Sequence, residues 1–167
     1  VRGAHLDETH GFSNGTSLFL CPAGHEHSSV ELTIARHGEN AVDWLVACGL
    51  PPTPGTLKDK HGCPVLKAGD HVKFEAQDFD SLIDHPVEMG ELQTGSFDAL
   101  GVTHVFAVYG ADADLDLERI CSDLKPVCEA QIALFEPDTK RAPFDHYVFM
   151  LHATDNGYGG LEHRNST

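Results

Sequence analysis

The sequence predicts an α+β fold in which a mainly β-sandwich-like N-terminal lobe leads into a β-helix-β unit, that is, strand, helix, strand. Three observations predict this class. Segments early in the chain alternate apolar and polar residues with the period of strands, an apolar stripe of helical spacing lies within residues 113–135, and strand-like runs flank that stripe. We therefore expect a β-rich domain over residues 1–93 and an α+β domain over residues 94–167.

In the first domain we expect strands and one helical turn. Residues 30–35 alternate apolar and polar side chains, and Pro22 closes an earlier β segment over residues 15–21. Asp78 can cap a helical turn that Pro86 ends. The further expected strands are 41–46, which follows the turn signal at 37–40, then 71–76 and 87–92.

The second domain carries the one long helix. Residues 102–109 form a nearly continuous apolar run, which favours a strand buried on both faces. Pro126 should kink the helix over residues 113–135 or split it in two. Residues 147–151 are the last expected strand. The apolar stripe of the helix comprises Leu117, Ile120, Cys121, Leu124, Cys128, Ile132 and Phe135.

Composition limits the classes of partner. The chain has 167 residues, of which 41% are hydrophobic and 22% charged, as in globular proteins. Its 26 acidic and 11 basic residues give a net charge of −15, so we expect no nucleic-acid partner, and no apolar run suggests a membrane segment. The acidity suits a cationic ligand such as a peptide amino terminus, although most of it is expected on solvated surface. Because Val1 is not Met, we expect a piece of a longer protein.

The cysteines favour a reducing compartment. Their number is odd and no Cys-x-x-Cys spacing occurs, so we expect reduced, mostly buried thiols and a cytoplasmic location, with the periplasm left open. The five residues are Cys21, Cys48, Cys63, Cys121 and Cys128.

Catalytic motifs are absent from the sequence. Its 12 histidines include no His-Glu-x-x-His pair for zinc, and no serine has a Gly-x-Ser-x-Gly context. A loop metal pair at His25 and His27 is less favoured than a solvated turn. A histidine-rich metal-storage domain would need clustered histidines, whereas these are scattered. We predict no catalytic residue and no metal ligand in this chain.

Glu162 is the residue singled out for binding. It follows a glycine-rich bend, and an extended peptide can add itself to a nearby strand edge. A carboxylate at the end of an edge strand could then pair with the α-ammonium of the peptide. The alternative is a glycine-rich turn in which Glu162 pairs with Arg164 or faces solvent, and the residues alone favour that alternative.

Four stretches, in order, resemble one enzyme family. Residues 155–166 contain Gly-Tyr-Gly-Gly-Leu-Glu-His-Arg, which is similar to a segment of the glycyl aminopeptidases, metallopeptidase family sixty-one. The other similar stretches are 10–20, 78–90, and 127–135 continuing into 143–152. Members of this family are zinc enzymes with an N-terminal β domain, a thermolysin-like catalytic domain and a PDZ domain.

The resemblance implies that the parent is a zinc-dependent aminopeptidase that hydrolyses N-terminal residues from peptides, and that residues 94–167 begin its thermolysin-like lobe. Its Zn²⁺ ligands would follow this chain, so the chain alone is expected to carry no cofactor and to be inactive. Residues 159–162 look like the counterpart of a Gly-x-Met-Glu-Asn segment, with Leu for Met and His163 for Asn. Glu88 is a weaker candidate, for which a domain-interface role is favoured. The implied substrate-binding residues are Gly159, Gly160, Leu161, Glu162 and Asn14.

A non-enzymatic reading also stays open at this point. The chain could be a β-sandwich binding module whose glycine-rich tail is only a linker. The two readings differ in what they expect of residues 144–163, which should pack as a strand and edge beside the long helix in the peptidase and should be free in the module.

Overall fold

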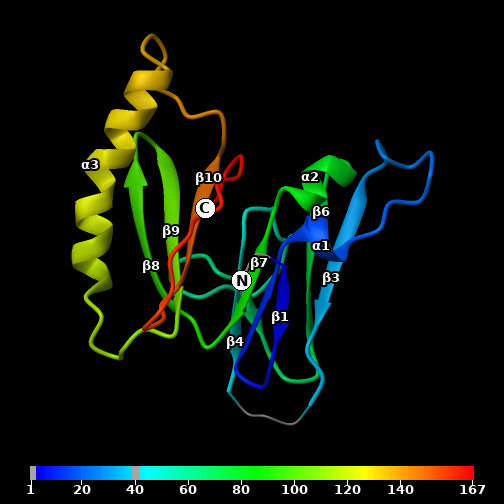
Figure 1. Cartoon of the computed structure of the whole chain (residues 1–167). Coiled ribbons are helices and arrows are strands. Elements are labelled where there is room, and N and C mark those ends of the chain that lie inside the picture. Colours follow the sequence, from blue (N-terminus) through cyan, green and yellow to red (C-terminus); the bar gives the residue numbers. More distant parts are fainter. Residues whose placement is uncertain (1–2, 39–41) are drawn as a thin grey trace.

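The structure is a computed structural model that describes residues 3–38 and 42–167, and it is built mainly from β-sheet (Figure 1). Within the described residues the helices are α1 (Gly15–Leu18), α2 (Phe79–Ile83) and α3 (Leu117–Phe135). The strands are β1 (Ala4–Leu6), β2 (His10–Ser13), β3 (Val30–Ala35), β4 (Trp44–Cys48), β5 (Val65–Leu66), β6 (His71–Ala76), β7 (Val87–Gly90), β8 (Gln93–Ala99), β9 (Val102–Tyr109) and β10 (His146–His152).

The N-terminal lobe is a sandwich of two antiparallel sheets. One sheet has the strand order β1-β2-β7-β4-β5, and the other is the pair β3-β6. Alternation along β4 sends every second side chain into the space between the sheets, where Val46 and Trp44 pack with Phe74 of β6. This burial accounts for the period-2 patterns of β3 and β6, whose outer residues face water.

The C-terminal lobe is a three-stranded sheet covered by α3 on its outer face. Its strand order is β10-β9-β8, with β8 antiparallel and β10 parallel to β9. The parallel pair needs a crossover connection, which α3 supplies. Cys121 of α3 packs against Phe106 and Val108 of this sheet, and Ile132 packs against Ala99.

The two lobes meet face to face in an apolar seam. Ala47, Cys63 and Leu92 from the N-terminal lobe pack against Val105, Ala107 and Val148 from the C-terminal sheet. The molecule therefore has four layers, with α3 outermost on one side and β3-β6 outermost on the other, as Figure 1 shows. The prediction that residues 102–109 are buried on both faces is confirmed, because β9 lies between α3 and the seam.

The strand predicted at 15–21 and the helix split predicted at Pro126 are not found. Residues 15–18 form α1 instead of a strand, because the Asn14 side chain caps them by accepting a hydrogen bond from the Thr16 backbone N–H. Helix α3 runs through Pro126 without a break, so the predicted split is wrong, while the alternative of a kink stays a prediction. Pro126 lies on the exposed side of the helix, where water can take up the carbonyl group that loses its partner.

Other elements match with small shifts. The strands predicted at 30–35, 71–76, 87–92, 102–109 and 147–151 are present as β3, β6, β7, β9 and β10. The strand predicted at 41–46 is found as β4, two residues later at its end; position 41 lies outside the described residues, as do positions 39 and 40 of the expected turn. Strands β1, β2, β5 and β8 were not predicted. No helix in the described ranges is both long and apolar enough to span a membrane.

Candidate functional site

The tail after β10 folds back along that strand and then pairs with it. The Val148 N–H donates to the Asn165 carbonyl at 3.0 Å, and the Met150 N–H donates to that of Thr167 at 2.8 Å. Ser166 forms a parallel bridge with Val148. The outer edge of β10 is therefore occupied by residues 165–167, and Figure 1 shows the tail running beside the strand. A tail held in this way does not behave as a free linker.

The glycine-rich segment itself is extended but unpaired. Residues 157–163 have no regular secondary structure, so the edge strand expected to end at Glu162 is not formed. The physical reason is that residues 165–167 already take the hydrogen-bonding edge of β10. A Cβ added to Gly160 would meet no atom within 4 Å. This backbone is therefore open to the approach of another chain.

Glu162 faces solvent at the end of this segment. In the described part of the chain no basic side chain forms an ion pair with it, and Arg164 instead pairs with Asp80 and Asp84. Of the two forms of the alternative, pairing of Glu162 with Arg164 is wrong, whereas a solvent-facing Glu162 is found as that alternative expected. An exposed carboxylate without a basic partner can accept a cationic ligand.

The residues just after Glu162 are attached to the N-terminal lobe. His163 Nδ1 lies 3.2 Å from Asp84 Oδ1, and the Arg164 backbone N–H donates to Asp84 Oδ2 at 3.3 Å. The Arg164 guanidinium also donates to Asp80 Oδ2 at 2.6 Å. Sequence reasoning missed these contacts, since the partners are separated by 79 residues or more and only their opposite charge could have suggested them.

Asn165 adds a further attachment near the seam. Its Nδ2 donates to the Gly49 carbonyl at 2.9 Å, and a Cβ at Gly49 would lie only 2.4 Å from Asn165 Oδ1. A side chain at position 49 would therefore displace the tail. Ser166, the next residue, is completely buried.

Asn14 has a structural role in the fold. Its Oδ1 accepts hydrogen bonds from the Thr16 backbone N–H at 3.2 Å and from Thr16 Oγ1 at 2.8 Å. The side chain is buried, and the next residue, Gly15, packs on the backbone of Ile83. Among the described residues no hydrogen bond joins Asn14 to residues 159–162. Its part in amine recognition stays a prediction.

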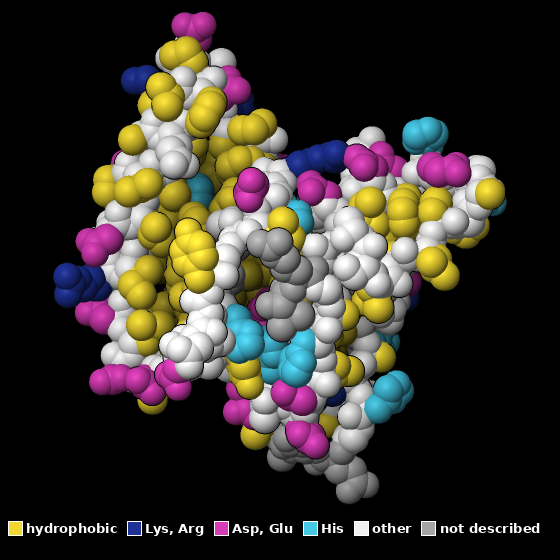
Figure 2. All heavy atoms as spheres, in the orientation of Figure 1, with side chains coloured by type: hydrophobic (Ala, Val, Ile, Leu, Met, Phe, Trp, Pro, Cys, Tyr) yellow, Lys and Arg dark blue, Asp and Glu magenta, His cyan; other side chains and the backbone are white. Residues whose placement is uncertain are grey.

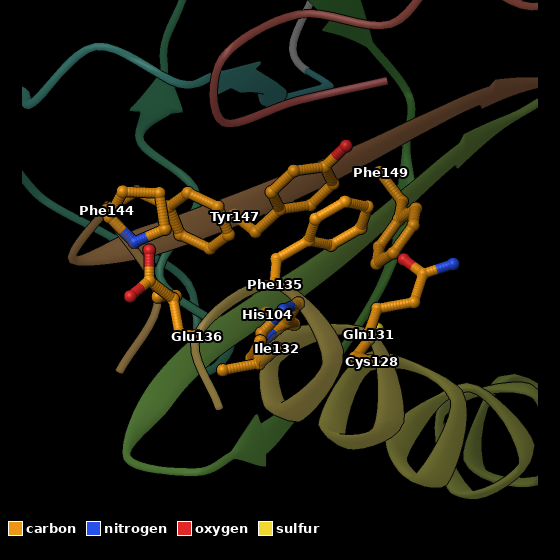
Figure 3. A pocket seen from close by; sticks show the side chains of 11 residues that line it. His104, Cys128, Gln131, Ile132, Phe135, Glu136, Phe144, Tyr147 and Phe149 are labelled. Atoms are coloured by element: carbon orange, nitrogen blue, oxygen red, sulfur yellow. The ribbon is translucent and has the colours of Figure 1, made fainter. Parts of the chain in front are cut away.

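An apolar groove lies between α3 and β10. It encloses about 280 Å³ and is lined by Ile132 and Phe135 from α3 and by Tyr147 and Phe149 from β10 (Figure 3). Burial raises the pKa of the Tyr147 hydroxyl, and the charges of Cys128 and Glu162 raise it further.

A second polar cluster lies at the junction of the lobes. His10 and Glu88 form a buried pair, and the His10 ring stacks on Tyr109 with ring centroids 3.9 Å apart. His152 approaches the same ring. Histidine side chains gather on this part of the surface in Figure 2. Glu88 is only 2% exposed, which places it at the interface between the lobes and away from any ligand in solvent.

Burial shifts the acid–base properties of this pair. Desolvation lowers the pKa of His10 to about 4, with the charges of His152 and His5 acting in the same direction. Desolvation also raises the pKa of Glu88 to about 8. Between these values the pair holds one proton.

The described residues do not fit a zinc site. Nowhere in residues 3–38 and 42–167 do three or more His, Cys, Asp or Glu side chains come together in an arrangement that could hold a metal ion. His25 and His27 lie in an exposed turn. All five cysteines are free thiols, as predicted, and four of them are buried.

The chain is similar to solved structures of peptidases. The chain resembles an aminopeptidase N family protein from Idiomarina loihiensis, with 38% identity, a TM-score of 0.82 and coverage of 98% of this chain. The match covers 25% of that protein, so the chain spans about a quarter of its length. A mutant of a two-domain M1 zinc metallopeptidase bound to L-arginine aligns over 89% of this chain and 33% of its own, with 10% identity and a TM-score of 0.46.

Sequence comparison identifies the family. No curated protein matches the chain. Residues 1–91, more than half of the chain, match the family model described as the peptidase M61 N-terminal domain. Together with the 38% identity to a solved relative over nearly the whole chain, this match shows that the chain belongs to peptidase family M61.

Proposed function

We propose that the whole protein is a metal-dependent aminopeptidase and that residues 159–162 bind the amino terminus of its peptide substrate. The observation that carries this proposal is the exposed Glu162 carboxylate, which has no basic partner among the described residues and ends an open glycine segment. Membership of a peptidase family supports the reaction class. A preference for N-terminal glycine is the finer part of the proposal.

Each part of the segment has a physical role in this function. The carboxylate of Glu162 would accept charge-assisted hydrogen bonds from the α-ammonium group, which fixes where the peptide begins. Gly159 and Gly160 would let the substrate backbone come close, since no side chain stands in the way. Binding in this manner positions the first peptide bond of the substrate at one place.

The catalytic metal would be held by other parts of the protein. Zinc is the metal that the resemblance to the glycyl aminopeptidases implies, and it would polarise the scissile carbonyl and activate water. Because the described residues do not form such a site, this chain would contribute substrate binding. We propose that residues 94–167 begin a thermolysin-like lobe, which the strand–helix–strand unit β9-α3-β10 supports.

The experiment is a kinetic comparison in the full-length protein. Hydrolysis of glycyl-p-nitroanilide should be lost on treatment with a chelator and restored by Zn²⁺. Glu162→Gln should raise KM by about 10- to 100-fold, because a neutral amide replaces the charged partner of the ammonium group. Glu8→Gln, which removes another exposed carboxylate far along the chain, should leave KM unchanged. A full-length protein that releases no amino acid from any peptide would refute the proposal.

A further inference from the structure

We infer that Asp84 is a positioning residue for substrate binding, because it fixes the segment that presents Glu162 to the amino terminus of the substrate. The inference rests on the proposed function of Glu162. Asp84 belongs to the N-terminal lobe, where it ends α2, whereas Glu162 follows the last strand of the C-terminal lobe. The amine site would therefore be completed by a contact between the lobes.

Both carboxylate oxygens of Asp84 contact the two residues that follow Glu162. Oδ1 lies 3.2 Å from His163 Nδ1, while Oδ2 accepts the Arg164 backbone N–H at 3.3 Å and lies 3.4 Å from Arg164 Nε. One of these contacts is to the backbone, so Asp84 fixes the path of the chain as well as its side chains. The attachment begins one residue after Glu162.

The surroundings make this contact stronger than an ordinary surface ion pair. The side chain of His163 is 8% exposed and that of Asp84 is 27% exposed, so water competes weakly for their hydrogen bonds. The neighbouring pair of Arg164 with Asp80 is different, because those side chains are 60% and 72% exposed. Exposed pairs of this kind contribute little to stability. Asp84 is therefore the principal anchor, and Asp80 is a matched control.

Few other contacts restrain the segment. Before it, the Ala153 N–H donates to the Tyr109 carbonyl at 2.9 Å, at the end of β10. Thr167 Oγ1 donates to the Leu161 carbonyl at 3.4 Å, the His163 N–H donates to the Ser166 carbonyl at 2.9 Å, and pairing with β10 resumes at Asn165. Without Asp84, the stretch that contains Glu162 would be a loop attached mainly at its ends. Displacement of a binding group by about 1 Å can cost up to about 100-fold in rate.

Two inhibitors can isolate the effect on amine binding in the full-length protein. Glycine hydroxamate and acetohydroxamate share the metal-chelating group, but only the first carries an amine. In Asp84→Asn, the inhibition constant of glycine hydroxamate should rise by about tenfold, whereas that of acetohydroxamate should stay within about twofold of the wild type. In Asp80→Asn, both constants should stay within about twofold.

Hydrogen exchange supplies a readout that does not depend on activity. The backbone N–H groups of His163 and Arg164 in the same protein are hydrogen-bonded to Ser166 and Asp84, and they should exchange about tenfold faster in Asp84→Asn than in the wild type or in Asp80→Asn. Faster exchange together with the selective loss of glycine hydroxamate binding supports the inference.

Failure of the inference can be told apart from failure of the proposed function. A wild-type protein without peptidase activity would refute the function of Glu162. If the wild type is active but Asp84→Asn binds both inhibitors as the wild type does, or weakens both equally, Asp84 has no positioning role. Unchanged exchange in Asp84→Asn would overturn the inference as well.

Discussion

The imidazole Nε2 of His10 meets the carboxyl Oε1 of Glu88 in the junction between the lobes, where both side chains are almost fully excluded from water. Since the pKa of His10 is lowered to about 4 and that of Glu88 is raised to about 8, the folded pair holds one proton between these values. The unfolded chain behaves differently, because a free histidine releases its proton near pH 6.5 and a free glutamate near pH 4.5. The stability of the fold is therefore linked to pH.

The sign of this linkage predicts a loss of stability between about pH 6.5 and pH 8. In that range the folded pair keeps one proton and the unfolded chain keeps none, so raising the pH favours unfolding. A difference of one bound proton over this pH interval lowers the free energy of unfolding by about 2 kcal/mol. Between about pH 4.5 and 6.5 the folded and the unfolded chain each hold one proton on these two residues, so the pair makes no contribution to the pH dependence of stability. Urea unfolding at a series of pH values measures this effect.

Glu88→Gln tests whether the His10–Glu88 pair causes the loss of stability with rising pH. Glutamine has a similar shape and does not titrate. The free energy of unfolding of the variant should therefore rise by about 2 kcal/mol relative to that of the wild type between pH 6.5 and pH 8. Glu91→Gln, an exposed neighbour at the end of the same strand, should follow the wild-type curve. Parallel curves for Glu88→Gln and the wild type would show that the pair does not hold the proton.

Asn14 can be tested for its two possible roles separately. Asn14→Ala should lower the free energy of unfolding by about 1 kcal/mol, because the Thr16 N–H loses its cap. Asn14→Ser keeps a capping oxygen, and its stability should remain within about 0.5 kcal/mol of the wild type. If Asn14 also contacts the substrate amine, the serine variant of the full-length protein will show a raised KM at normal stability. An unchanged KM would limit Asn14 to capping.

Gly160 should matter for binding and hardly at all for folding. A methyl group at this position meets no atom within 4 Å, so Gly160→Ala should change the free energy of unfolding by less than about 0.5 kcal/mol. In the full-length protein the same methyl group would obstruct an approaching peptide backbone, and KM should rise severalfold. Gly49→Ala is the contrasting variant, since its Cβ would press on Asn165 and His85 and loosen the tail. A Gly160→Ala enzyme with normal KM would argue against close backbone approach.

Local patterns in the sequence predicted much of the fold. Strands β3 and β6 alternate because one face of each packs on the sandwich core, and the apolar run of β9 reflects burial on both faces. Strand β2 has no such pattern, since it buries His10 and Ser13, whose partners come from other strands. The sequence of residues 15–18 was interpreted as part of a strand. It forms a helix because the Asn14 side chain caps its first turn.

The candidate site was only partly predictable. The glycine segment and Glu162 are contiguous, so a local motif can identify them. Their attachment to Asp84 depends on how the lobes pack, and no pattern near either residue reports a contact across 79 positions. The unpaired state of the segment was also missed, because the competition from residues 165–167 for the edge of β10 is a tertiary effect.

Strand β4 of the N-terminal lobe has no face left for water. Trp44, Val46 and Cys48 of β4 point into the sandwich, while Leu45 and Ala47 point into the seam. Separating the lobes would expose apolar surface of both to water, and the free energy of this exposure would destabilise each lobe. The chain should therefore melt as a single cooperative unit, and either lobe produced alone should be prone to aggregation.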